Sequence, residues 1–314
     1  MSLVVGDRPV ADVEQELRAL ALHPKEQMLR ALELLRDEDD AQGRAAALAV
    51  LAERAGVKER ALRPVLLGLY EKLDSPKKDP GGYLRTAIVH ALRPVAQGKD
   101  AALLERAAMT HDFGSYGGKD VAGMLRAEAL VALSEVAPQV AGAHAVHLLL
   151  DPHTDEMSGE PVLTAIRLLA AGEQALPLYA HLLQEGERLA EVVTECLKHM
   201  VHLPAPLALA LAQRYLEVRS DIVHVGVVDM VVGHDEPAAV AAPLLEFLAA
   251  TRAYDVYHYA VTALVASRNA DLLAGVLHLA ERELDHTRRQ SLRQALSLVR
   301  GNAEVERRLE EWGE

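Results

Sequence analysis

The chain has 314 residues and a formal net charge of −13, with 46 acidic against 33 basic side chains. This excess of negative charge repels phosphate-rich surfaces at long range and disfavours a nucleic-acid groove along the whole chain. Aromatic residues make up only 4% of the sequence, Leu and Ala dominate it, and a single cysteine excludes an internal disulfide. Such a composition favours closely packed helices over strands.

The first residues lack both a basic start and a long apolar core, and no apolar run approaches the ~18 residues that span a bilayer. We therefore expect a cytoplasmic protein with no secretory signal and no membrane partner. The heavy use of Ala, Leu and Arg is typical of GC-rich bacterial genomes and carries no biochemical information.

A helix-forming phrase recurs along the chain. It reads Leu-Arg-Thr-Ala-Ile-Val-His-Ala-Leu at residues 84–92 and returns at residues 125–133. The starts of successive copies lie about 30–41 residues apart, which is the spacing of stacked helical pairs. The looser copies begin near Arg44, Leu163, Val193, His224, Tyr257 and Arg288.

Each copy opens the second helix of a predicted pair, and a first helix precedes it. The clearest first helices are expected at residues 94–110, 175–184, 206–218 and 237–251, and their second helices at 121–136, 188–201, 221–232 and 255–266. Apolar stripes on such helices are buried only against the next pair. The sequence thus predicts an all-α fold, an α-solenoid or superhelix of about eight stacked antiparallel helix pairs. One domain spans residues 1–314, with charged caps at 1–35 and 284–314.

The second helices resemble those of the HEAT-repeat family, which often begin with an acidic residue followed, after a small gap, by Val-Arg, Ala and Ala-Leu. Residues 120–133 match best and residues 79–92 match next, whereas Leu163, Val193 and His224 replace the arginine in later units. The resemblance covers most of the chain as a divergent HEAT-like array. It implies an armadillo-like curved scaffold whose second helices line a concave wall and which is used chiefly for protein recognition.

Four early pairs contain enlarged turns, at residues 36–43, 74–82, 110–118 and 151–160. Corresponding turns of stacked units project from the same edge, so we expect these loops to lie side by side on one rim. Their glycines, aromatic rings and charges suit a binding surface, and five of the basic residues fall in one region of the chain. The candidate rim residues are Lys77, Lys78, Arg85, His111, Asp112, Phe113, Tyr116, Lys119, Arg126, His153, Asp155 and Glu156.

A second candidate surface is the densest aromatic run, which starts a second helix at Tyr254, Tyr257 and His258. On the concave wall these rings would contact a partner with large area and little entropy loss. The alternative is that one tyrosine packs between repeats while the others shield the seam.

No catalytic motif stands out. His111, Asp112, His153, Asp155 and Glu156 are suitable metal ligands by type, yet no close-spaced pair fixes their geometry. Neither a phosphate-binding loop nor a serine nucleophile elbow occurs in the sequence. We therefore expect no metal and no cofactor.

The sequence favours a non-catalytic scaffold that uses the concave wall and the rim to bind a protein or peptide. The negative charge steers a basic segment more readily than an acidic one. The alternatives are a DNA-binding or DNA-repair protein similar to the HEAT-like alkylpurine glycosylases, and a metal- or bilin-handling enzyme. Nucleic acid is disfavoured by the charge, and the oligomeric state stays open.

Overall fold

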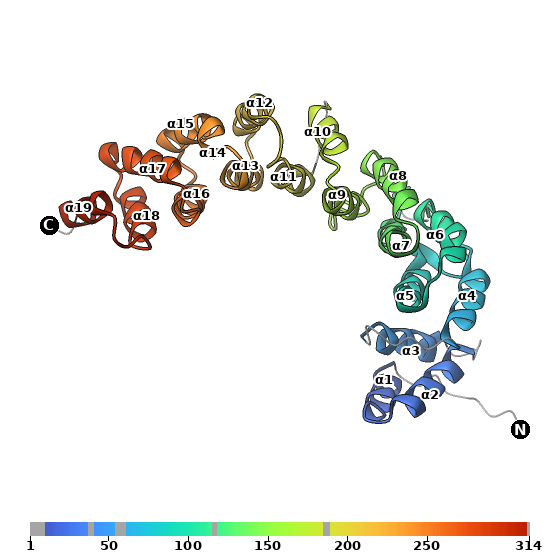
Figure 1. Cartoon of the computed structure of the whole chain (residues 1–314). Helices are drawn as coiled ribbons and strands as arrows, with labels where there is room; N and C mark the ends of the chain where they lie inside the picture. Colours follow the sequence, from blue (N-terminus) through green and yellow to red (C-terminus); the bar gives the residue numbers. More distant parts are fainter. Residues whose placement is uncertain (1–9, 37–40, 54–60, 115–117, 185–188, 313–314) are drawn as a thin grey trace, which may run out of the picture. The chain divides into compact units, whose positions relative to one another are not determined.

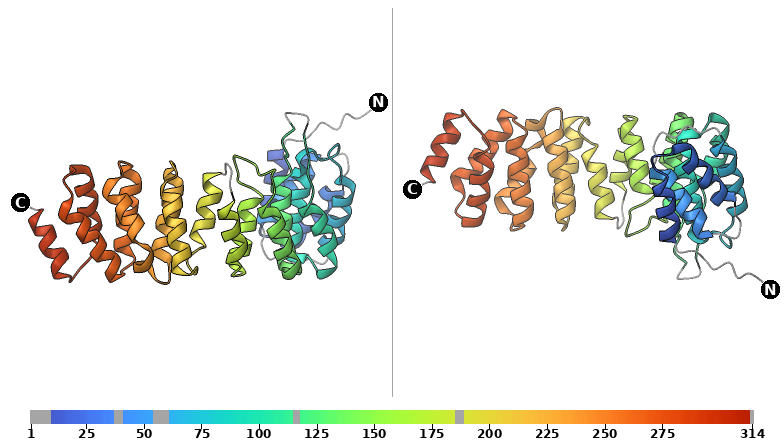
Figure 2. Two further views of the ribbon diagram at one scale, coloured as in Figure 1. Left: turned by 90° about the horizontal axis from the view of Figure 1, so that it is seen from above. Right: turned by 90° about the horizontal axis from the view of Figure 1, so that it is seen from below.

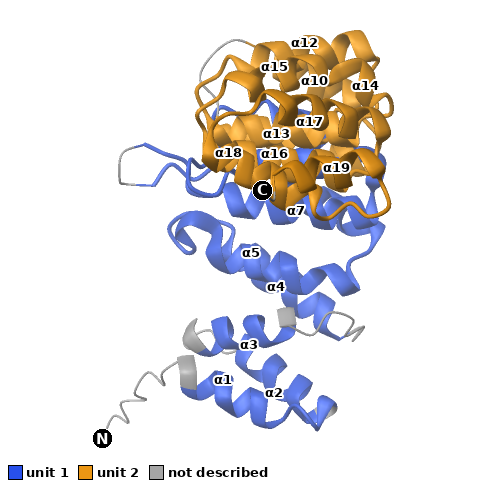
Figure 3. Ribbon diagram, turned by 90° about the vertical axis from the view of Figure 1, so that its left-hand side faces the viewer, with its two compact units in different colours: residues 1–168 blue, residues 169–314 orange. Residues whose placement is uncertain are grey.

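The computed structural model describes residues 10–36, 41–53, 61–114, 118–184 and 189–312, and this part of the chain is all-helical (Figure 1). It contains 19 α-helices and no β-strand, apart from an isolated bridge between Phe113 and Asp120. Contacts divide the chain into two compact units, residues 1–168 and residues 169–314 (Figure 3). The division falls inside one helix, and each unit is described by itself.

Unit 1 is built from two layers of helices (Figure 1). The helices α1, α3, α5 and α7 pack in succession in one layer. In the other layer α2 packs against α4, and α6 and α8 both cover α7. The bounds are α1 Val10–Ala19, α2 Pro24–Arg36, α3 Ala41–Glu53, α4 Leu62–Leu73, α5 Tyr83–Leu92, α6 Ala101–Ala108, α7 Gly123–Val136, α8 Pro138–Leu149 and α9 Val162–Ala171.

Unit 2 repeats this arrangement, and its helices lie side by side (Figure 2). The helices α11, α13, α16 and α18 pack in succession, while α12, α14, α15 and α17 form the second layer. The bounds are α10 Ala175–Leu183, α11 Ala190–Lys198, α12 Ala205–Leu216, α13 Asp221–Gly233, α14 Pro237–Val240, α15 Ala242–Ala250, α16 Tyr254–Ala266, α17 Ala270–Arg282, α18 His286–Leu296 and α19 Ala303–Glu311.

The recurring phrase supplies the apolar core between successive second helices. Ile88 of α5 and Leu125, Leu130 and Leu133 of α7 are fully buried where these two helices pack. In unit 2, α11 and α13 approach closely at Gly226 of α13, where a Cβ atom would lie 2.9 Å from the Thr194 Cα atom of α11. Burial of the apolar stripe against the neighbouring helix, as predicted from the sequence, therefore holds within each unit.

Two predicted helices differ from the observed ones. The helix expected at 94–110 begins only at Ala101, because two short 3₁₀ turns at 93–95 and 98–100 precede it. The Asp100 carboxylate accepts the Gln97 N–H at 2.8 Å and also binds Arg63 of α4, which holds this turn outside the helix. The helix expected at 237–251 is broken at residue 241 into α14 and α15, with a proline in the first turn of α15. None of the described helices has the length and apolar character to cross a bilayer.

Candidate functional site

Three of the four enlarged loops of unit 1 lie side by side, as the repeat spacing predicts. The Gly81 N–H donates to the Asp112 carboxylate at 2.6 Å, which joins the loop 74–82 to the loop predicted at 110–118. In the structure this loop continues to residue 121, and its described residues are 110–114 and 118–121; we call it the loop 110–121. The rings of His111 and His153 are 5.5 Å apart, which joins 110–121 to 151–160. Residues 110–114 and 118–121 of the third loop extend beyond the ends of the unit 1 helices (Figure 2). Residues 37–40 of the fourth loop lie outside the described part. We call the three contacting loops the rim.

The buried side chain of Arg126 of α7 binds to two of these loops, 110–121 and 151–160. Its side chain has no exposed surface, and its guanidinium pairs with Asp120 and, at 3.1 Å, with Asp151. It also donates to the carbonyl oxygens of Thr110 at 3.1 Å and His153 at 3.2 Å. One buried cation therefore ties both ends of the loop 110–121 to the start of the loop 151–160.

Arg85 of α5 likewise holds the loop 74–82 in place through buried ion pairs. Its side chain is 1% exposed and pairs with Asp79 at 3.1 Å and with Asp74 at 3.0 Å. The Asp79 carboxylate also accepts the backbone N–H groups of Leu84 and Arg85, both at 3.0 Å, as a cap on the first turn of α5. The two carboxylates thus hold the turn against the helix it precedes.

These anchors use two of the five basic residues that fall in one region of the chain. Arg85 and Arg126 are buried and paired, so a basic patch of Lys77, Lys78, Arg85, Lys119 and Arg126 does not form at the surface. The physical reason is the six-residue spacing from Asp79 to Arg85 and from Asp120 to Arg126, which returns each guanidinium onto the carboxylate of its own turn. The start of the second helix carries buried or largely buried polar residues in other copies too, at Arg44, Thr194, His224, Tyr257 and Arg288.

The rings of His111, Phe113 and His153 contact one another and form a cluster that spans two loops. His111 and Phe113 are stacked, with centroids 5.9 Å apart and an interplanar angle of 8°. His153 meets Phe113 edge to face at 4.9 Å. Phe113 nevertheless stays 53% exposed, and the His111 Nε2 atom lies 3.7 Å from the Asp151 carboxylate. The cluster is therefore fixed in place while one of its faces remains open to solvent.

The other candidate rim residues differ in exposure. Asp112 is buried and serves the loop structure, whereas Lys77 and Lys78 are exposed on the loop 74–82. Lys119 and Glu156 form an exposed ion pair at 3.2 Å across two loops. Tyr116 lies outside the described residues.

Asp155 organises its own turn. Its carboxylate accepts the N–H groups of Met157 at 2.9 Å and Ser158 at 2.7 Å, and the Ser158 hydroxyl at 3.0 Å. The Ser158 N–H bond is the largest of the effects that lower the pKa of Asp155. The turn leaves Met157 98% exposed beside Glu156.

The second candidate surface, at the start of α16, is corrected in one position. Tyr257 is fully buried, its ring lies 4.4 Å from the Arg288 guanidinium, and burial raises its pKa to about 12. The alternative that one tyrosine packs between repeats is the one observed. Tyr254 is 45% exposed and its hydroxyl donates to Asp285 at 3.2 Å, and His258 is also exposed.

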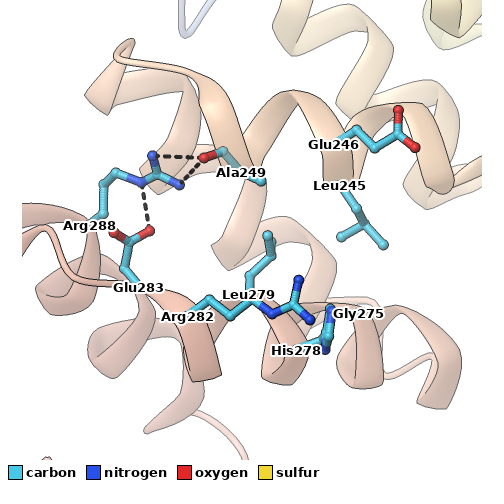
Figure 4. A pocket seen from close by; sticks show the side chains of 9 residues that line it. All are labelled: Leu245, Glu246, Ala249, Gly275, His278, Leu279, Arg282, Glu283 and Arg288. Atoms are coloured by element: carbon cyan, nitrogen blue, oxygen red, sulfur yellow. Dashed lines mark hydrogen bonds and ion pairs between the residues drawn. The ribbon is translucent and has the colours of Figure 1, made fainter.

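A cavity of about 320 Å³ lies between α15 and α17 of unit 2 (Figure 4). Leu245 and Glu246 line one side, and Leu279 and Arg282 line the other. Arg288 closes one end, where it pairs with Glu283 at 2.8 Å and donates to main-chain carbonyls of α15 and the turn after it. Sequence reasoning did not single out the Arg288–Glu283 pair, although Arg288 occupies the same place in the phrase as Arg85 and Arg126.

Among the described residues, no three His, Cys, Asp or Glu side chains are grouped so that they could hold a metal ion. What the rim offers is a fixed, partly apolar surface with charges at its edge, which is suited to binding a partner. No protein-family model matches this chain, and no curated protein or solved structure matches it either.

Proposed function

We propose that this protein is a non-catalytic, HEAT-like scaffold that binds a protein or peptide through the rim of unit 1. The proposal rests on one observation: Phe113 is 53% exposed while its ring contacts those of His111 and His153. An exposed aromatic ring that is already held in position loses little entropy when a partner covers it. Surface residues that only connect helices need no such support.

Exposed apolar side chains accompany Phe113 on the rim and its flanking helix ends. Isolated exposed apolar residues are ordinary, but a group of them on neighbouring loops marks an interaction site. The members are Tyr83 (72% exposed), Met109 (38%), Val121 (44%), Met124 (50%), Leu150 (54%) and Met157 (98%).

The buried ion pairs support this reading because they act on the loops from the inside. Arg126 reaches both loops at once, so a partner meets a surface whose backbone is already placed. Binding residues in proteins are disproportionately found on loops that a rigid scaffold positions. The charge of the chain, −13, favours a partner with a basic segment.

A photocrosslinking experiment tests the rim directly. A benzophenone amino acid replaces Phe113 in the full chain, the protein is incubated in cell extract and irradiated, and crosslinked proteins are identified by mass spectrometry. The matched control carries the same group at Leu284, which is 87% exposed in unit 2. We expect a distinct product at position 113 that is absent from position 284.

A charge variant then tests the expected partner chemistry. Glu156→Lys should reduce that product, because the new positive charge repels a basic partner segment. The substitution should leave the loop intact, since among the described residues Glu156 forms an ion pair only with Lys119. Asp155 is unsuitable because it holds its own turn. Glu33→Lys is the control, since Glu33 is 65% exposed and pairs with Arg30 in α2. Equal products at positions 113 and 284, or no product at 113, contradicts the proposal.

A further inference from the structure

An open groove of about 670 Å³ lies between α18 and the end of α19 in unit 2. Its volume is within the range of ligand and peptide pockets. The lining differs from the rest of this acidic chain, because it contains two arginines and a histidine and, among the described residues, no carboxylate. The full lining is His286, Arg289, Gln290, Arg293, Gln294, Ser297 and Trp312.

The helical repeat places these side chains on one face of α18. Residues 286, 289, 293 and 297 are spaced by three or four positions, as are Gln290 and Gln294. From His286 to Ser297 the helix rises about 16 Å, which is the length of about five residues of an extended peptide. The exposed face thus matches a short peptide segment in length.

The two arginines of the groove are not held in ion pairs with the described neighbouring side chains, although the Arg289 Nη2 group donates to the Glu283 carbonyl oxygen at 2.8 Å. Among the described residues neither Arg289 nor Arg293 takes part in an ion pair, and the Arg289 Nε atom is buried without a hydrogen-bond partner. The nearby Glu283 carboxylate is already paired with Arg288 at 2.8 Å. The Asp285 carboxylate, which caps the start of α18, accepts hydrogen bonds from two neutral donors, the Tyr254 hydroxyl and the Arg288 backbone N–H.

We propose that this groove binds an acidic peptide segment in an extended conformation. Arginine guanidinium groups bind carboxylates through paired, charge-assisted hydrogen bonds. The amides of Gln290 and Gln294 supply donors and acceptors for the peptide main chain. Trp312 also lines the groove, and its carbonyl oxygen accepts from Arg293 at 3.2 Å.

Charge complementarity favours an acidic peptide over a nucleic acid. A nucleic acid carries its charge continuously and would meet the net −13 of the chain beyond the groove. A short acidic segment places its charge only where the arginines are. This site is independent of the rim, since it lies in the other unit and selects the opposite charge.

The single tryptophan of the chain lines the groove, so intrinsic fluorescence reports binding there. The probes are a fluorescein-labelled eight-residue peptide of Glu, Asp and Ser, its twin with Lys and Arg in the acidic positions, and an eight-nucleotide thymidine oligonucleotide. Unlabelled versions are titrated against Trp312 emission and labelled versions against anisotropy. We expect the acidic peptide to bind, to change the emission, and to weaken as NaCl rises.

Three variants test the assignment. Arg293→Glu should weaken the acidic peptide by about tenfold or more, because it reverses one of the contacting charges. Gln290→Ala with Gln294→Ala should weaken it by about threefold while leaving the Arg293–Trp312 contact in place. Arg307→Glu is the control, since Arg307 is 64% exposed on α19 outside the lining.

Thermal unfolding checks that each variant is folded. The proposal is overturned if the acidic peptide binds no better than its basic twin, if the oligonucleotide binds more tightly than the acidic peptide, or if Arg307→Glu weakens binding as much as Arg293→Glu.

Discussion

The guanidinium of Arg126 lies 3.1 Å from the carboxylate of Asp151, and this contact joins a helix to the loop of the next helical pair. Both groups are almost completely buried, at 0% and 4% side-chain exposure. A buried pair of this kind repays its desolvation only when both partners are present. The Arg126–Asp151 pair therefore helps to fix the loops of the rim, and loss of either partner should destabilise the protein.

Replacing Arg126 by Met should destabilise the protein by about 3–5 kcal/mol, because Asp120 and Asp151 are then left buried without their cation. The measurement is urea unfolding followed by circular dichroism at neutral pH. The matched control is Lys119→Met, which removes an exposed ion pair between the same two loops and should cost about 0–1 kcal/mol. Similar losses in both variants would contradict the anchoring role of Arg126.

Two glycines in helices should respond in opposite directions to alanine. At Gly226 a Cβ atom would meet backbone atoms of Thr194 at 2.9 and 3.2 Å, so Gly226→Ala should cost about 1–3 kcal/mol through overpacking. At Gly68 of α4 a Cβ atom meets nothing within 4 Å, so Gly68→Ala should stabilise by about 0.5–1 kcal/mol through its higher helix propensity. Thermal unfolding of both variants checks the pair, and a stabilising Gly226→Ala would refute the close approach of α11 and α13.

Three tyrosine hydroxyls should ionise only at an unusually high pH. The pKa values of Tyr70, Tyr257 and Tyr259 are raised to about 12, in each case chiefly by burial. The folded state thus prefers the neutral phenol. Its contribution to stability is present below the unfolded pKa of about 10 and is lost as the pH rises toward 12.

A titration of absorbance at 295 nm from pH 9 to 13 tests this expectation. The tyrosinate signal should still be rising above pH 11, and Tyr257→Phe should remove part of that late rise. Asp229→Asn should move part of it to lower pH, since the carboxylate of Asp229 accepts the Tyr259 hydroxyl and also raises the Tyr259 pKa. A titration that is complete by pH 11 in the wild-type protein counts against the burial of these phenols.

The turn at Asp155 should loosen in acid. The pKa of Asp155 is lowered, first by its bond from the Ser158 N–H, so the ionised form stabilises the folded turn. That stabilisation is present above the unfolded pKa of about 3.9 and is lost as the pH falls through the lower folded value. Amide exchange measured by NMR should show the Met157 and Ser158 N–H groups losing protection in this range.

Asp155→Ala should remove the protection of the same two amides already at neutral pH, with no effect on the first turn of α7. Protection that is independent of both pH and this substitution would show that the carboxylate does not hold the turn.

Much of the arrangement of unit 1 could be predicted from periodicity. A phrase that returns after about 40 residues places equivalent turns at equivalent positions, so the neighbouring placement of the loops that carry Phe113 and His153 was predicted from spacing, while the contact between the two rings was not. The burial of Leu125 and Leu130 followed in the same way from their place on the apolar stripe. The order of the loops and the burial of the apolar stripe depend on local, repeated sequence features, so the sequence alone was sufficient to predict them.

The role of the polar residues in the phrase was decided only by tertiary structure. Arg126 and Lys119 are both basic residues beside the same loop, yet one is buried and the other is exposed. Asp151, which approaches from the following pair, gives the buried guanidinium of Arg126 a second carboxylate partner besides Asp120, whereas Lys119 pairs only with the exposed Glu156 among the described residues. In the same way, the basic face of α18 can be read from its spacing, but it becomes a groove only because the chain turns back and places Trp312 against it.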